Sequence, residues 1–401
     1  MSRYVLKFGG SSVATPELLR AVARRAVAFV QQGHQLLVVV SAMGKTTDGL
    51  ISLAGTMGKA ERREMDQLLA TGEQQTIALL AMALRSLGVP ARSYTGAQAG
   101  LRAGGYHMEG RIQAIHPQML EEDMEEGVVP VVAGFQAGDV QGDVITLGRG
   151  GSDLSAVALA AALEADVCYI YTDVSGVFTA DPRVVPEARK MVRVPFNVCA
   201  EMAMLGAKIL QARSVEMAMR FNVPVVVLSS FEEEEGTWIM REDISEGLVV
   251  QAVVHDRNVA KVAVMGVPDK PGVAAELFSA LGQRGLAVEM IIQSVMRGDV
   301  NDIAFLVKKE ILGEALETCQ AFARRVESQG VLVDTEVGRV SIVGAGIAHH
   351  ADVPSRMFSV LGKLGVNIDM IASTSLSITC VVSASQIEEA VRALHANFIG
   401  V

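Results

Sequence analysis

The feature that most constrains the fold of this chain is a regular alternation of short apolar runs with long amphipathic segments, from residue 4 to about residue 230. The apolar runs are rich in Val, Ile and Leu and are typical of buried strands, whereas the longer segments have helical periodicity. This alternation predicts an α/β domain with a largely parallel sheet sandwiched by helices. The expected strands are YVLKF, LLVVVSA, VVPVVAGF, VCYIYTD and VPVVVLSS, and the expected helices are PELLRAVARRAVAFVQQG, ALLAMALRSLG, DLSAVALAAALEA and EMAMLGAKILQARSVEMAMRF.

The remainder of the chain contains an internal repeat. One copy begins at Val262 and the other at Val340, and the second carries a two-residue insertion between its first strand and its helix. Each copy has the pattern of a ferredoxin-like βαββαβ unit. The acidic run FEEEEGTW at residues 231–238 is interpreted as a solvated turn or linker that closes the first domain. The predicted domains are 1–245, 246–335 and 336–401.

The amino-acid composition limits the kinds of partner that this chain can bind. Half of the residues are hydrophobic and the formal net charge is -10, which argues against a nucleic-acid or anionic-membrane surface and favours small molecules or protein as partners. The N-terminus has no signal-peptide pattern, and apolar stretches break before the roughly 18 residues of a membrane span. Cys168, Cys199, Cys319 and Cys380 are widely spaced and are expected to be reduced core thiols. A cytoplasmic location is predicted.

The stretch YVLKFGGSSVA places a lysine at the end of an apolar strand. Burying Lys7 is costly unless an anion meets it. Gly9 and Gly10 let the backbone approach a ligand, and the Ser11 and Ser12 hydroxyls can line a phosphate or carboxylate. A snorkelling lysine before an ordinary turn explains the stretch equally well.

A second candidate site is TLGRGGSDLSAVALAAA, in which Arg149, two glycines, Ser152 and Asp153 precede a strongly helical run. A helix N-terminus attracts anions through its free N–H groups and its dipole. The alternative is that Ser152 or Asp153 only caps the helix. In LATGEQQTIALL, Glu73 is expected at the start of a helix, where an acidic residue is favourable on structural grounds alone.

Three further patterns bear on nucleotide binding. The turns TDVSG and ADPR carry Asp173, Asp181 and Arg183 near the carboxyl end of a strand, where ligands lie in open α/β sheets. SAMGKTTDGL contains G-K-T, but Val39 stands where a P-loop needs another glycine, so a P-loop is excluded. VGAGIAHHADV lacks the third glycine of a dinucleotide fingerprint because His349 occupies that position.

Taken together, KFGGSSV, SAMGKTTDGL, TGEQ, TLGRGGSD, TDVSGVFTADPRVV and GAKIL resemble the aspartokinases of the amino-acid kinase superfamily, and the repeat resembles their paired ACT regulatory domains. The resemblance covers nearly the whole chain. It implies the amino-acid kinase fold followed by two ACT domains. The implied reaction transfers the γ-phosphoryl group of ATP to the β-carboxylate of L-aspartate, the first step of lysine, threonine and methionine biosynthesis. Mg²⁺ is expected to arrive with ATP, and no protein metal site is predicted.

The resemblance also implies site residues. The catalytic set is Lys7, Asp153 and Lys208. The substrate set is Thr47, Glu73, Phe135, Arg149, Gly150 and Ser152, with Arg149 on the α-carboxylate and Glu73 on the α-ammonium. The ATP set is Lys7, Phe8, Gly9, Gly10, Ser11, Ser41, Thr172, Asp173, Phe178, Arg183 and Lys208.

For the regulatory half, the resemblance implies feedback inhibition by lysine, threonine or both. The expected effector residues are Asp269, Gly272, Val273, Ala274, Gln293, Asp302, Asn367 and Ile368. The first copy keeps the turn DKPGVA, whereas the second has HHADVPSR, so one effector pocket is expected around the first copy. At least a homodimer is predicted, and an internal start such as Met240 would give a separate ACT-only subunit. Two rival functions stay open: another carboxylate or carbamate kinase of the superfamily, and an amino-acid sensor without catalysis.

Overall fold

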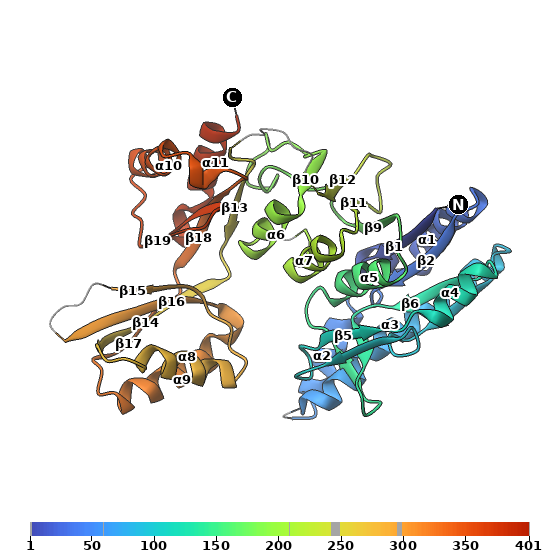
Figure 1. Ribbon diagram of the computed structural model, residues 1–401, viewed down its shortest axis with the longest axis horizontal. Coiled ribbons are helices and arrows are strands. Elements are labelled where there is room, and N and C mark those ends of the chain that lie inside the picture. The colour runs from blue at the N-terminus through green and yellow to red at the C-terminus, as the bar shows by residue number, and fades with distance from the viewer. Residues whose placement is uncertain (1, 59, 208, 242–248, 295–298, 401) are drawn as a thin grey trace. The chain divides into compact units, whose positions relative to one another are not determined.

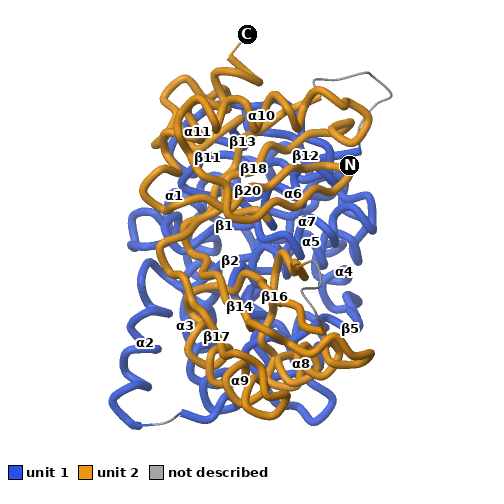
Figure 2. The backbone as a smooth tube through the Cα atoms, turned by 90° about the vertical axis from the view of Figure 1, so that its left-hand side faces the viewer, with its two compact units in different colours: residues 1–178, 190–204, 208–246 blue, residues 179–189, 205–207, 247–401 orange. Residues whose placement is uncertain are grey.

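The computed structural model describes residues 2–58, 60–207, 209–241, 249–294 and 299–400 (Figure 1). The chain forms two compact units, shown in different colours in Figure 2. Unit 1 comprises residues 1–178, 190–204 and 208–246, and unit 2 comprises residues 179–189, 205–207 and 247–401.

Unit 1 is built on an eight-stranded sheet in the order β10-β12-β11-β9-β1-β2-β6-β3. Its central strands are parallel, as predicted, and only β11 and β12 pair antiparallel. The acidic run FEEEEGTW leads into β12, the strand next to the edge strand β10, and the sequence did not predict this strand. The strands are β1 (Arg3–Phe8), β2 (Gln35–Val40), β3 (Ala91–Tyr94), β6 (Val129–Ala133), β9 (Val167–Thr172), β10 (Arg193–Pro195), β11 (Val225–Ser229) and β12 (Thr237–Met240).

Helices cover both faces of this sheet. One face packs on α1 and α3, which share a buried core with β1, β2 and β6, while α5 contacts β1, β2 and β9. The prediction of a single helix over EMAMLGAKILQARSVEMAMRF is wrong, because this segment forms the end of α6 and the whole of α7. Gly206, between the two helices, has a φ of 119° that a helix does not allow. The helices are α1 (Pro16–Gln31), α2 (Thr46–Gly55), α3 (Arg62–Ser86), α4 (Gln118–Glu125), α5 (Gly151–Ala162), α6 (Phe196–Met204) and α7 (Ala212–Phe221).

A second, smaller sheet in unit 1 was not predicted from the sequence. It has the order β5-β4-β7-β8, with β4 (Leu101–Gly104), β5 (Arg111–Ile115), β7 (Gln136–Gly138) and β8 (Val144–Thr146). These strands are only three to five residues long, and β4, β5 and β7 contain Gly, Arg or Gln, so the sheet lacks the long Val and Ile runs that identified the other strands. β8 leads directly into the GRGGSD segment.

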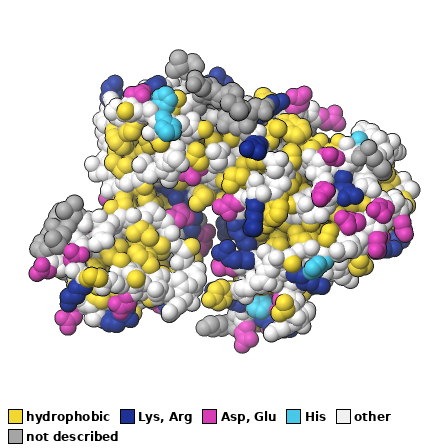
Figure 3. All heavy atoms as spheres, in the orientation of Figure 1, with side chains coloured by type: hydrophobic (Ala, Val, Ile, Leu, Met, Phe, Trp, Pro, Cys, Tyr) yellow, Lys and Arg dark blue, Asp and Glu magenta, His cyan; other side chains and the backbone are white. Residues whose placement is uncertain are grey.

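Unit 2 contains two four-stranded antiparallel sheets, each with a pair of helices. The first has the order β15-β16-β14-β17. Its strands carry the exposed apolar residues Ile291, Leu332 and Val333, and Figure 3 shows hydrophobic side chains gathered on the surface of this repeat. Its elements are β14 (Val259–Pro268), α8 (Val273–Gln283), β15 (Glu289–Gln293), β16 (Val300–Lys308), α9 (Leu312–Arg325) and β17 (Gly330–Asp334).

The second sheet has the order β13-β18-β20-β19 and an unexpected edge strand. β13 (Ala252–Asp256) lies within the range predicted for the first repeat domain, yet it pairs with β18 beside the second copy, in the position that β17 takes beside β14. Residues 179–189 also belong to unit 2, where Val184 and Val185 join the core of the second copy. The other elements are β18 (Val337–Val343), α10 (Asp352–Lys363), β19 (Met370–Ser373), β20 (Ser377–Ser383) and α11 (Ile387–Phe398).

The described cysteines are free and buried. Among the described residues, no helix is both long and apolar enough to span a membrane.

Candidate active site

Lys7 is buried near the carboxyl end of β1, with only 7% of its surface exposed. Its neighbours Leu6 and Phe8 face the core shared with α1 and α3, so strand alternation directs Lys7 toward the opposite face, which α5 covers. The Lys7 Nζ lies 2.6 Å from Asp153 Oδ1 in the first turn of α5. The snorkelling interpretation is therefore wrong. The ion pair fixes the ammonium group and leaves N–H donors available for an anion.

Glu73 lies in the middle of α3, not at a helix start as predicted. The helix continues through Gly72, where a Cβ would come 2.8 Å from the Ala42 Cβ, so glycine allows α3 to approach the loop after β2. Glu73 Oε1 accepts a hydrogen bond of 3.0 Å from the Ala42 N–H, while Glu73 Oε2 is buried and has no partner among the described residues. Burial raises the pKa of Glu73 to about 7. A cation placed at Oε2 would satisfy this carboxylate and stabilise its charged form.

The GRGGSD segment forms the entry to α5. Gly150 is the N-cap with φ 71°, and no side chain caps this helix. The capping interpretation of Ser152 and Asp153 is therefore wrong, and Asp153 is free to hold Lys7. Ser152 is buried against Gly134, where a Cβ would lie 2.7 Å from the Ser152 Cβ. Arg149 is exposed on the loop immediately before the N-cap.

Phe135 packs beside this entry. It follows β6 with φ 69°, and it contacts the cluster formed by Ala54, Met65 and Leu69. Thr47 is half-buried in the first turn of α2, near the same end of the sheet.

The predicted phosphate loop follows β1 and packs against the loop that follows β2. A Cβ on Gly9 would lie 3.5 Å from Lys7 Nζ, and a Cβ on Gly10 would lie 2.9 Å from the Ala42 carbonyl oxygen. The Ser41 N–H donates to the Phe8 carbonyl at 3.1 Å. These glycines therefore place backbone directly beside the lysine, with Ser11 exposed at the loop surface.

The predicted nucleotide-side residues differ in their surroundings. The Phe8 ring stacks on Tyr171 in the core, with centroids 4.5 Å apart, so only the backbone of Phe8 could meet a ligand. Thr172 and exposed Asp173 lie at the carboxyl end of β9, next to β1. Phe178 is half-buried and follows this strand by six residues in the sequence.

Two other nucleotide-side predictions fall elsewhere. Arg183 belongs to unit 2, where its Nη2 pairs with Asp181 Oδ2 at 2.8 Å. Lys208 lies outside the described residues. The structure therefore brings together Lys7, the glycine loop, the GRGGSD segment and Glu73. The roles of Arg183 and Lys208 stay predictions.

The first repeat of unit 2 contains a cavity of about 380 Å³ at the turn before α8. Five predicted effector residues line it, whereas Asp302, Asn367 and Ile368 are absent from its lining. Asp302 instead accepts a hydrogen bond of 2.8 Å from the Gly266 N–H. The predicted residues in the lining are Asp269, Gly272, Val273, Ala274 and Gln293.

Sequence reasoning missed Asn301, which lies on the cavity side of β16. Its Nδ2 donates to Asp269 Oδ1 at 3.0 Å, and its Oδ1 is buried with no partner in the part of the chain that the structure describes. Strand alternation could have found it, because residues 301 and 303 share a face and both line the cavity while residue 302 points away.

The second repeat differs at the corresponding turn. A Cβ on Gly344 would lie 2.1 Å from the Val249 carbonyl oxygen, so the chain before β13 covers this turn. The loop that carries the two-residue insertion contains a 3₁₀ turn (Ile347–His349), and Ile347 is buried in the core of the second copy.

Comparison with known proteins agrees with these features. Residues 2–229 match the model of the amino acid kinase family, and residues 262–321 and 340–398 each match an ACT domain. The chain is 44% identical over 402 residues to an aspartokinase of Pseudomonas aeruginosa, covering 99% of this chain and 98% of that protein. It is 42% identical over 401 residues to an aspartokinase of Thermus thermophilus, covering 99% of each.

Solved structures give the same result. A crystal structure of E. coli aspartokinase III in complex with aspartate and ADP matches with a TM-score of 0.85 and 25% identity, covering 98% of this chain and 99% of that one. Aspartate kinase from Synechocystis matches with a TM-score of 0.56 and 42% identity, covering 100% of this chain and 69% of that one. Because the curated relatives are matched over nearly their whole length, catalytic and regulatory parts alike, the chain belongs to the aspartokinase family.

Proposed function

We propose that this chain transfers the γ-phosphoryl group of ATP to the β-carboxylate of L-aspartate. A β-carboxylate oxygen attacks the γ-phosphorus, the bond from phosphorus to the β,γ-bridging oxygen breaks, and ADP leaves with 4-phospho-L-aspartate as the product. The attacking carboxylate, with an ordinary pKa of about 4, is already ionised at neutral pH, so no general base is needed. The residues must instead position the two substrates and neutralise the transferring phosphoryl group.

Lys7 is the residue best placed for that neutralisation. It is buried, held by Asp153 at 2.6 Å and lies beside the Gly9 backbone. A cation that is fixed before the reaction needs no reorganisation as charge develops on the phosphoryl oxygens. Lys208 would supply a second positive charge, and Thr172, Asp173, Phe178 and Arg183 would form the nucleotide side. The nucleotide enters as its Mg²⁺ complex, so Mg²⁺ is part of that substrate.

The single observation that carries the choice of amino-acid substrate is the buried Oε2 of Glu73, which has no partner within the described ranges. A desolvated carboxylate with one free oxygen suits an α-ammonium group, which an N-acylated substrate lacks. Arg149 would hold the α-carboxylate through its guanidinium fork, with hydrogen bonds from Thr47 and Ser152 and with Phe135 as a wall.

The cavity in the first repeat would bind the feedback amino acid, lysine or threonine. Asp269 would pair with its ammonium group, and the N-terminus of α8 at Gly272 would take its carboxylate. The covered turn of the second repeat supports a structural role for that copy, although Asn367 and Ile368 could still lend backbone groups from a second subunit.

We also propose a cytoplasmic homodimer or higher oligomer, together with a separate ACT-only subunit from an internal start, which mass spectrometry of the endogenous protein would test. Exposed apolar residues on β15 and β17 support association through the first repeat sheet. The proposed domains are 1–245, 246–335 and 336–401, with β13 assigned to the sheet of the second repeat.

Replacement of Glu73 tests the substrate assignment. Glu73→Gln keeps the shape and the acceptor for the Ala42 N–H but removes the negative charge. We expect the KM for aspartate to rise about a hundredfold, the scale of a lost charge-assisted contact, while the KM for ATP changes little. Steady-state kinetics with each substrate varied in turn gives both values. An equal rise in both would contradict the assignment.

A further inference from the structure

We infer that the buried carboxylate of Asp66 is a positioning residue that holds the Arg149 loop, residues 147–150, in the geometry that binds the amino-acid substrate. This inference rests on the proposed function. Asp66 lies on α3 and is fully buried, yet it matches no motif in the sequence and takes no part in the phosphoryl transfer described above.

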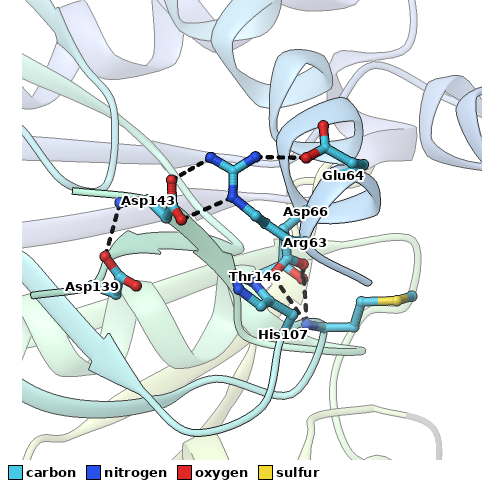
Figure 4. Close-up of polar contacts among 8 residues, drawn as sticks. Arg63, Glu64, Asp66, His107, Asp139, Asp143 and Thr146 are labelled. Carbon is cyan, nitrogen blue, oxygen red and sulfur yellow. Dashed lines mark hydrogen bonds and ion pairs between the residues drawn. The ribbon is translucent and has the colours of Figure 1, made fainter. Parts of the chain in front are cut away.

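Asp66 joins two segments that are distant in sequence (Figure 4). The Thr146 hydroxyl, at the end of β8, donates to Asp66 Oδ1 at 2.5 Å. In the turn between β4 and β5, the Met108 N–H lies 3.1 Å from both carboxylate oxygens, and His107 Nδ1 lies 2.7 Å from Oδ2. A buried carboxylate is tolerated only when it is hydrogen-bonded in this way.

The Arg149 loop needs such an anchor because its backbone is intrinsically free. Gly148 and Gly150 flank Arg149 with φ 78° and 71°, and Gly151 follows at the start of α5. Glycine gives the chain conformational freedom that must be removed by contacts on either side if Arg149 is to present its guanidinium in one place.

Contacts at the start of the loop remove that freedom. The Thr146 carbonyl accepts from the Gly110 N–H at 2.8 Å, and the Leu147 N–H donates to the Phe135 carbonyl at 2.8 Å. Arg213 of α7 then donates to the carbonyls of Leu147 and Gly110, each at 2.9 Å. Asp66 fixes the same two segments from the other side, through Thr146 and Met108, so the strand end is held by its side chain as well as by its backbone.

The position of Asp66 on α3 gives this anchor a specific consequence. Glu73 lies on the same helix about two turns further on, and therefore on the same face. Helix α3 thus carries Glu73, which would bind the substrate ammonium group. Through Asp66 and Thr146, the same helix also positions the loop of Arg149, which would bind the substrate α-carboxylate. Helix α3 therefore fixes the distance between Glu73 and Arg149, the two charged residues proposed to bind the amino-acid substrate.

The test uses Thr146→Val, which removes the hydroxyl and keeps the shape, and Thr146→Ser, which restores the donor. We expect Thr146→Val to raise the KM for aspartate about tenfold or more, as misplacement of a binding group does, with a small change in the KM for ATP. Thr146→Ser should return the KM for aspartate to near the wild-type value. Should Thr146→Val fail to fold, Asp66→Asn, which keeps an oxygen acceptor, gives the same comparison.

Asp123→Asn is the matched control. Asp123 is also a buried carboxylate of unit 1, on α4, and it accepts hydrogen bonds from Tyr94 Oη at 2.6 Å and from Arg92 at 2.7 Å. These partners lie on β3 at the edge of the sheet, not on the Arg149 loop. Asp123→Asn should lower the melting temperature and leave the KM for aspartate unchanged.

Two results would overturn the inference. In one, Thr146→Val behaves like Asp123→Asn, less stable but with a wild-type KM for aspartate. In the other, it raises the KM values for aspartate and ATP equally, which indicates general damage. Failure of the proposed function would appear separately, as a wild-type chain that does not phosphorylate aspartate, and would overturn both.

Discussion

The candidate active site of unit 1 and the cavity in the first repeat of unit 2 both carry groups suited to an amino acid, but they are built differently. In the active site Lys7 and Glu73 are buried, and Lys7 is already paired with Asp153. In the cavity Asp269, Gly272 and Gln293 are exposed, and among the described lining residues only Asn301 offers a buried polar side chain. Chemistry requires charges that are fixed before the substrate arrives. A sensing site can instead leave contacts unmade, so that effector binding supplies them and shifts the protein between states.

The two repeats sharpen this contrast. They share a sheet order and helix placement, yet the first has a cavity at its turn, whereas backbone of Val249 covers the turn of the second. The same fold thus leaves a cavity at this turn in one copy and a covered turn in the other.

The largest effect is expected at the fixed charge. Lys7→Ala should lower kcat about a thousandfold, because the transferring phosphoryl group loses its positioned cation. Calorimetric titration of the variant with the inhibitory amino acid should still show binding, since the cavity lies in unit 2. A variant that keeps appreciable turnover would contradict the role of Lys7.

A pH effect should follow from the burial of Glu73. Its pKa of about 7 means that the neutral form, which cannot pair with an ammonium group, accumulates below neutrality. The KM for aspartate should rise about tenfold for each pH unit below 7, with little change in the KM for ATP. A flat profile of the KM for aspartate between about pH 5.5 and about pH 8 would contradict this assignment.

The same pKa predicts the sign of a stability change. Folding raises the pKa of Glu73 from 4.5 to about 7, so the folded chain keeps a proton that the unfolded chain releases as the pH rises through this range. The free energy of unfolding should therefore fall by about 3 kcal/mol between these pH values. Urea unfolding of Glu73→Gln at several pH values should show a free energy of unfolding without this pH-dependent fall. An identical pH dependence in the variant and the wild type would refute the raised pKa of Glu73.

The cavity should give a smaller and separable effect. Asn301→Ala removes the buried amide that contacts Asp269 and should raise the effector concentration for half-inhibition about tenfold. Basal kcat and KM should stay near wild type because Asn301 takes no part in the active site. Loss of basal activity together with inhibition would show that the cavity is not a separate site.

The smallest effect is expected in the second repeat. His350→Ala changes an exposed residue in the turn that corresponds to the cavity turn, and half-inhibition should change less than about twofold. A shift as large as that of Asn301→Ala would show that the second copy also binds effector.

Much of this arrangement could be predicted from the sequence where a pattern extends over many residues. The five buried strands and the start of the GRGGSD helix were predicted correctly, because apolar runs and helix periodicity are strong signals. The small sheet that delivers β8 to Arg149 was missed, since its strands are three to five residues long. The prediction of Glu73 at a helix start was wrong because the preceding glycine, Gly72, serves close packing inside α3 and does not interrupt it.

Other features depend on tertiary contacts that no local pattern encodes. The pairing of β13 with the second repeat joins strands about 80 residues apart in sequence. Residues 179–189 begin inside the TDVSGVFTADPRVV motif, yet they pack in unit 2. Asp66 stands in an ordinary helical segment, and only the folded chain brings Thr146 and His107 to it.

The most direct test of the account is a hydroxylamine-trapping assay of the wild-type chain with ATP, Mg²⁺ and a panel of carboxylates that includes L-aspartate, N-acetyl-L-aspartate and succinate. Hydroxylamine converts an acyl phosphate to a stable hydroxamate, so it reports the product itself. We expect aspartyl hydroxamate from L-aspartate and far less product from the two compounds that lack an ammonium group. A folded chain that forms no aspartyl hydroxamate, or that accepts N-acetyl-L-aspartate equally well, would contradict it.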